Sequence, residues 1–171
     1  MKTVLVVLVA ALALLLPAGA AAKGPSEAQI TGPGLLSPLK ITGLGEGDSS
    51  TSLGLLVNDG GFFPQAFGQS PSPLLRTEPK NRGPRYLVTY TVPGPMLSAL
   101  QQDLYPYASG GPVTFMRPGQ AFWGDQRTVG GWYRGTPQLK TMLVEAGLPP
   151  STPERRHVVS ILLAIVRHFL P

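Results

Sequence analysis

The sequence predicts an α+β fold, in which an antiparallel sheet of several short strands carries two C-terminal helices packed on it. Two observations lead to this expectation. Alternating apolar residues bounded by Pro and Gly turns recur between positions 27 and 116, which is typical of antiparallel strands. Two segments with helical periodicity and helix caps follow after position 135. Strands first and helices last place the helices on one face or end of the sheet.

The first two strands are predicted as a hairpin. Glu27–Thr31 and Leu39–Thr42 are each followed by glycine, and the stretch between them contains Gly34 and Pro38. Glycine and proline favour a turn at this point. We therefore expect the two strands to pair with each other.

A short helix is predicted after this hairpin. Residues 53–57 are mostly apolar, Ser50–Ser52 can supply the N-cap, and Gly60 can end the helix. The stretch Phe62–Pro84 is rich in Pro, Gly, Ser and charge, and we interpret it as an irregular surface connection.

The clearest strand is predicted over Arg85–Val92. One face of it would carry Tyr86, Val88, Tyr90 and Val92. This alternation of β-branched and aromatic residues fits a half-buried strand. Further strands are predicted over Leu100–Tyr105 and Pro112–Met116, each followed by a Pro or Gly turn.

The first C-terminal helix is predicted from its caps. Thr136 is placed as the N-cap, Pro137 as the first helical residue and Gly147 as the stop. The apolar stripe consists of Leu139, Met142, Leu143 and Ala146. Residues 23–150 then form a single α+β domain.

The second helix is predicted over residues 151–171. Ser151–Glu154 reads as a capping box. The apolar stripe is Val158, Ile161, Leu162, Ile165, Val166 and Phe169. This helix would either dock on the core or lie on a membrane, with Arg155 and Arg156 near anionic headgroups.

The N-terminus predicts a secreted protein. Lys2, the apolar run Val4–Leu16 and the small residues up to Ala22 resemble a signal peptide over residues 1–22. The chain contains no cysteine, so the exported domain would be stable without disulfides. The missing cysteine also excludes a bacterial lipoprotein anchor.

Charge is unevenly distributed along the mature chain. Residues 23–75 hold two basic and four acidic side chains, whereas residues 76–171 hold eleven basic and five acidic ones. A basic surface outside a cell would attract cell-wall polymers or an anionic membrane surface. Alternatively, the positive charge only keeps the domain soluble.

Catalytic signals are weak. The two histidines, His157 and His168, both lie in the predicted terminal helix, and no nucleophile motif surrounds the serines. We expect no catalytic residue, no metal site and no cofactor. The alternative is an extracytoplasmic hydrolase of wall glycans that uses Asp103 or Asp125 as its acid.

Aromatic residues and arginines come close together between positions 117 and 134. The predicted binding surface consists of Trp123, Trp132, Tyr133, Arg117, Arg127 and Arg134. Flat aromatic rings on loops can stack on sugars or anchor a protein partner, and arginine is a common neighbour in both settings. The two tryptophans would otherwise cover the sheet as core residues.

Four segments resemble a group of uncharacterised secreted proteins of actinobacteria. They are residues 26–35, 83–86, 102–107 and 131–134. The resemblance implies export from the cell but no established activity. Together with the binding surface, it leads us to expect a non-catalytic binding or interaction module of the cell envelope. Its partner would be a wall polymer, an anionic membrane surface or an envelope protein, and we expect no specific nucleic acid.

Overall fold

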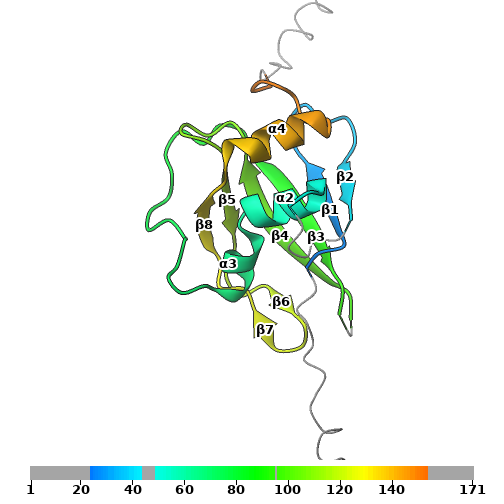
Figure 1. Cartoon of the computed structure of the whole chain (residues 1–171), viewed down its shortest axis with the longest axis vertical. Helices are drawn as coiled ribbons and strands as arrows, with labels where there is room; N and C mark the ends of the chain where they lie inside the picture. Colours follow the sequence, from blue (N-terminus) through cyan, green and yellow to red (C-terminus); the bar gives the residue numbers. More distant parts are fainter. Residues whose placement is uncertain (1–23, 44–48, 95, 154–171) are drawn as a thin grey trace, which may run out of the picture.

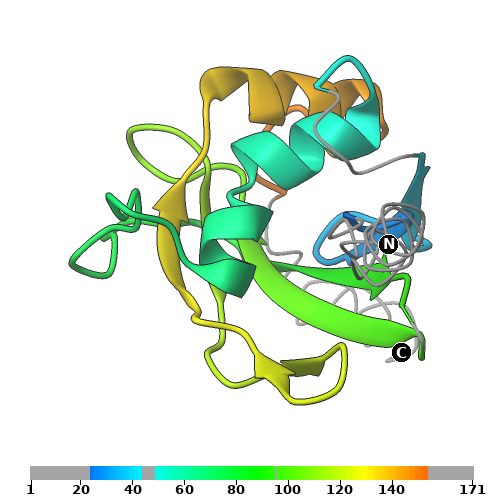
Figure 2. The same ribbon diagram turned by 60° about the horizontal axis from the view of Figure 1, so that its bottom comes forward.

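The computed structural model describes residues 24–43, 49–94 and 96–153, which form a sheet with helices on one face (Figures 1 and 2). The main sheet contains β1 (Glu27–Thr31), β2 (Leu39–Thr42), β3 (Tyr86–Val92), β4 (Ser98–Tyr105), β5 (Val113–Met116) and β8 (Gly131–Arg134). Its order is β2-β1-β3-β4-β5-β8, and every neighbouring pair is antiparallel. A small hairpin, β6 (Ala121–Phe122) and β7 (Gln126–Arg127), lies between β5 and β8 in sequence. The helices are α2 (Ser52–Asp59), α3 (Phe62–Phe67) and α4 (Pro137–Glu145). The predicted α+β fold is confirmed.

The core lies between the helices and the inner face of the sheet. Strand β3 buries every second side chain, as the alternation of its apolar residues predicted. Helices α2 and α4 contribute leucines to the same core. The largest buried apolar side chains are Tyr86, Tyr90, Phe62, Ile30, Leu53, Leu56, Leu100, Leu104, Met116, Leu139 and Leu143. Burial of each such side chain contributes about 1.5–3 kcal/mol. Among the described residues, these side chains form one continuous core.

The capping residues of α2 and α4 show how these two helices contact each other. The Thr51 hydroxyl accepts a hydrogen bond from the Gly54 amide at 3.0 Å, which caps α2. Thr136 is the N-cap residue of α4, but its hydroxyl donates to the Asp59 carboxylate at the end of α2. The predicted caps of both helices are confirmed in position, and the second one links two helices.

One expectation is wrong. Phe62–Pro84 was predicted to be irregular throughout, yet its first six residues form α3. Gly61 adopts a positive φ of 70°, which lets the chain turn directly from α2 into a second helix. Phe62 and Gln65 are then buried against the sheet. The predicted signal peptide (1–22) and the body of the second C-terminal helix (154–171) lie outside the described residues.

A buried polar network joins α3 to the sheet. Gln65 Nε2 donates to Thr114 Oγ1 at 3.3 Å and to the Gly131 carbonyl at 2.8 Å. Gln102 Nε2 donates to Gln65 Oε1 and, at 2.9 Å, to the Gly60 carbonyl. Tyr90 completes it by donating to Gln102 Oε1 at 2.8 Å. In the described residues no buried side-chain polar atom lacks a partner.

Replacing Gln65 by leucine should test this network. The change keeps the side-chain volume but removes the hydrogen bonds of Gln65 to Thr114, Gly131 and Gln102, so we expect the free energy of unfolding to fall by about 3 kcal/mol. Gln101→Leu, on the exposed side of β4, is the control and should change stability by less than about 0.5 kcal/mol. Urea denaturation measures both. Equal stability of Gln65→Leu and the wild type would contradict the role of the network.

Stability should fall at alkaline pH because of Tyr90. Burial raises the pKa of this phenol above its ordinary value of 10.0. Above pH 10 the unfolded chain loses a proton that the folded chain keeps, so unfolding becomes easier by about 1.4 kcal/mol per pH unit. Below pH 10 the effect is absent. Urea titrations from pH 9 upward measure the free energy of unfolding. It should fall less steeply with pH in Tyr90→Phe than in the wild type, and identical slopes of the two proteins would contradict this prediction.

Candidate functional site

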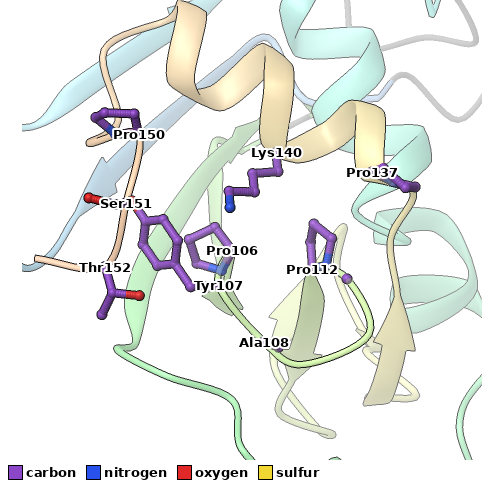
Figure 3. A pocket seen from close by; sticks show the side chains of 10 residues that line it. Pro106, Tyr107, Ala108, Pro112, Pro137, Lys140, Pro150, Ser151 and Thr152 are labelled. Atoms are coloured by element: carbon purple, nitrogen blue, oxygen red, sulfur yellow. The ribbon is translucent and has the colours of Figure 1, made fainter.

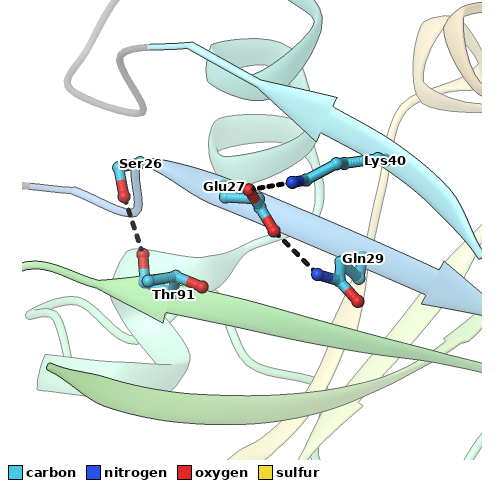
Figure 4. A network of polar contacts seen from close by, with 5 residues as sticks. All are labelled: Ser26, Glu27, Gln29, Lys40 and Thr91. Atoms are coloured by element: carbon cyan, nitrogen blue, oxygen red, sulfur yellow. Dashed lines mark hydrogen bonds and ion pairs between the residues drawn. The ribbon is translucent and has the colours of Figure 1, made fainter.

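The outer face of the sheet is polar along β1 and β2. Glu27 forms an ion pair with Lys40 at 2.8 Å and accepts a hydrogen bond from Gln29 at 2.8 Å (Figure 4). The hydrogen bonds from Lys40 and Gln29 lower the pKa of the Glu27 carboxyl. This side of the sheet is an ordinary solvated surface.

The other half of the outer face is aromatic. The rings are Tyr105 on β4, Phe115 on β5 and Trp132 on β8, which we call the aromatic row. The strand register places Phe115 opposite Trp132, with ring centroids 4.6 Å apart. The Tyr105 and Trp132 centroids are 5.8 Å apart. Aromatic rings at these separations stabilise each other beyond their burial.

Part of the irregular segment 72–84, at the left of Figure 1, lies against this row. The Leu75 amide donates to the Trp132 carbonyl at 2.8 Å. The Arg82 guanidinium lies 5.1 Å from the Tyr105 ring centroid and 4.9 Å from that of Trp132. Glu78, four residues earlier in the sequence, forms an ion pair with Arg82. These contacts fix the position of a cation over two rings.

A hollow of about 630 Å³ lies beside the aromatic row, and we call it the outer hollow. Its lining residues are Glu78, Pro79, Lys80, Asn81, Arg82, Gly83 and Tyr105. Burial raises the pKa of the Tyr105 phenol, and the Asp103 carboxylate raises it further. The hollow therefore combines an aromatic ring with two cations, one carboxylate and one amide.

The structure does not bring the six residues of the predicted binding surface together. Trp132 and Arg134 lie on the outer face, where Arg134 donates to the Gly110 carbonyl at 2.8 Å. Tyr133 points to the inner face, because consecutive strand residues alternate, and a side chain at Gly61 would overlap its ring. The other three, Trp123, Arg117 and Arg127, lie at the β6–β7 hairpin. Both tryptophans are partly buried.

Sequence reasoning missed Lys80, Arg82 and Tyr105. Arg82 lies far in sequence from the rings that it contacts, so no local pattern indicated it. The four-residue spacing of Glu78 and Arg82 gave no signal either, because it indicates an ion pair only on a helix and this segment is not helical.

A second hollow, of about 410 Å³, lies beneath α4 (Figure 3). Four prolines line it together with Tyr107, Lys140, Ser151 and Thr152, among others. The Lys140 ammonium lies 5.1 Å from the Tyr107 ring centroid, and the Tyr107 hydroxyl donates to the Pro149 carbonyl. These contacts hold the segment after α4 against the domain.

The carboxylates proposed for hydrolysis are Asp103, on β4, and Asp125, after β6. Asp103 forms an ion pair with Arg85 at 3.5 Å, and Asp125 is exposed in the turn between β6 and β7. Neither lines a hollow described above. Within the described ranges no group of three His, Cys, Asp or Glu side chains is placed to hold a metal ion. In the same ranges, no helix has the length and apolar character to cross a membrane.

Comparisons of the chain with protein-family models, with curated proteins and with solved structures find no match. The resemblance to secreted actinobacterial proteins therefore stays a prediction.

Arg82→Ala should reveal how much this side chain stabilises the segment above the aromatic row. We expect a loss of about 1–2 kcal/mol in the free energy of unfolding, because the contacts of this half-buried side chain with two rings are removed. Lys80→Ala, from the same segment, should lose less than about 0.5 kcal/mol. Urea denaturation compares them. An equal effect of the two substitutions would mean that Arg82 is only a solvated surface residue.

Proposed function

We propose that this protein is a secreted, non-catalytic module of the cell envelope that binds an acidic wall glycan in the outer hollow. The observation that carries the proposal is the composition of that hollow, which is lined by the two cations Lys80 and Arg82 together with Tyr105. Lys80 and Arg82 complement carboxylate or phosphate groups on the polymer. Tyr105 is buried beneath Arg82 and contributes apolar lining to the hollow.

The polar groups of the hollow support the same ligand class. Glu78 and the Asn81 side chain offer acceptors and donors for sugar hydroxyls. Because Arg82 is already positioned over Tyr105 and Trp132, less side-chain entropy is lost when a ligand binds. The uneven charge of the sequence favours an acidic ligand, since eleven of its basic residues follow position 75.

The test is retention of the chain from Lys23 on insoluble cell wall, over a series of salt concentrations. Lys80→Gln should lower the bound fraction roughly threefold to tenfold, because a charge-assisted contact is removed. Lys40→Gln is the matched control: it removes the same charge from β2, at the far edge of the sheet, and should bind like the wild type.

Two results would contradict the proposal. One is equal retention of Lys80→Gln and the wild type at every salt concentration. The other is release of soluble sugar fragments from the wall by the wild-type protein, which would favour the hydrolase alternative.

A further inference from the structure

Exposed apolar side chains gather at the end of the domain where β3 turns into β4. In the described residues, Met96 is 75% exposed, Leu97 78%, Val129 52% and Phe67 38%. Together with Trp123 we call them the apolar end. Soluble domains normally leave such side chains exposed singly, whereas an exposed group of them indicates a contact surface.

Short contacts connect the segments that carry this group. The Phe67 and Trp123 ring centroids are 5.7 Å apart. Trp123 Nε1 donates to the Pro93 carbonyl at 2.7 Å, next to the turn that carries Met96. Val129 donates its amide to the Ala66 carbonyl at 3.3 Å. Figure 1 shows α3, the β6–β7 hairpin and the β3–β4 turn at one end of the molecule.

Trp123 is held in one position, and its indole N–H already has a hydrogen-bond partner. Its φ of 42° is unusual for a bulky residue, and the following Gly124 also has a positive φ. Gly94 leaves room for the indole, because a side chain there would overlap the ring. An indole whose N–H already has a partner can enter an apolar region at little cost, and tryptophan is enriched at membrane interfaces.

Two arginines accompany the apolar end. Arg127 on β7 and Arg117 just before β6 are both exposed, against one acidic neighbour, Asp125, in the hairpin turn. Basic side chains close to a bilayer are attracted to anionic headgroups. This surface thus combines exposed apolar side chains with positively charged ones, which is the composition of surfaces that contact a membrane interface.

The chain also enters the domain at this end. The Ser26 amide donates to the Thr91 carbonyl at 3.0 Å, so β1 begins beside the end of β3 (Figure 4). The apolar run Val4–Leu16 is connected to this point by residues 17–23, which can span at most roughly 25 Å. Until the predicted signal peptide is removed, insertion of that run into a membrane would keep the apolar end within this distance of the bilayer.

We propose that the apolar end is a peripheral contact with an anionic lipid bilayer. Met96, Leu97 and Phe67 enter the boundary between headgroups and acyl chains, while Arg117 and Arg127 contact the headgroups. This contact is separate from the outer hollow, so either proposal can fail without the other.

The test uses vesicles of phosphatidylglycerol and phosphatidylcholine in equal amounts and the chain from Lys23. The core residues that the structure describes all lie between positions 28 and 148 of that chain. The double variant Met96→Ser, Leu97→Ser should reduce the vesicle-bound fraction roughly tenfold. Leu36→Ser is the control, because Leu36 is also fully exposed but lies in the β1–β2 turn, at the opposite end of β1. All chains should keep a cooperative urea transition.

A second readout follows Trp123 alone. In a Trp132→Phe background, the fluorescence emission of Trp123 should shift to shorter wavelength when anionic vesicles are added. Three results would overturn the proposal: undiminished binding of the double variant, an unchanged emission spectrum, or equal binding to vesicles of pure phosphatidylcholine.

Discussion

The hydrogen bonds of Gln65 determine how the helical layer is placed on the sheet. This buried amide, on α3, contacts Thr114 on β5, Gln102 on β4 and the Gly131 carbonyl at the start of β8. Each of these groups would be costly to bury without a partner. The network therefore favours one position of α3 over all alternatives, in a domain that has no cysteine to form a disulfide.

Both proposed surfaces depend on that position. The Gly130 amide donates to the Gln65 carbonyl at 2.7 Å, which fixes the start of β8 and so the place of Trp132 in the aromatic row. On the other side of α3, Ala66 accepts from Val129, and Phe67 packs against Trp123. The short helix α3 thus supports both the glycan site that we propose in the outer hollow and the lipid contact that we propose at the apolar end.

The sequence was sufficient to predict features that local patterns determine. The alternation from Tyr86 to Val92 and the turns around it predicted β3, and the caps predicted α2 and α4. Helix α3 was missed because its sequence, with Pro64 and three phenylalanines, has no local helix signal, and its stability comes from Gln102 and Thr114 far along the chain.

The candidate site was predicted less well for the same reason. Trp132 and Tyr133 are neighbours in sequence, but the strand turns them to opposite faces of the sheet. The cation over Trp132 is Arg82, which lies fifty residues earlier. Proximity in sequence is therefore a poor guide to a site built on strands and a distant loop.

Hydrogen exchange of glutamine side-chain amides, followed by NMR, tests the central role of the network most directly. We expect the Nε2 protons of Gln65 and Gln102 to exchange as slowly as the backbone amides of β3 and β4. Exposed Gln101, next to Gln102 on the same strand, provides the fast reference. Exchange of the Gln65 side-chain amide as fast as that of Gln101 would contradict this role of the network, because α3 would then not be fixed to the sheet by buried hydrogen bonds.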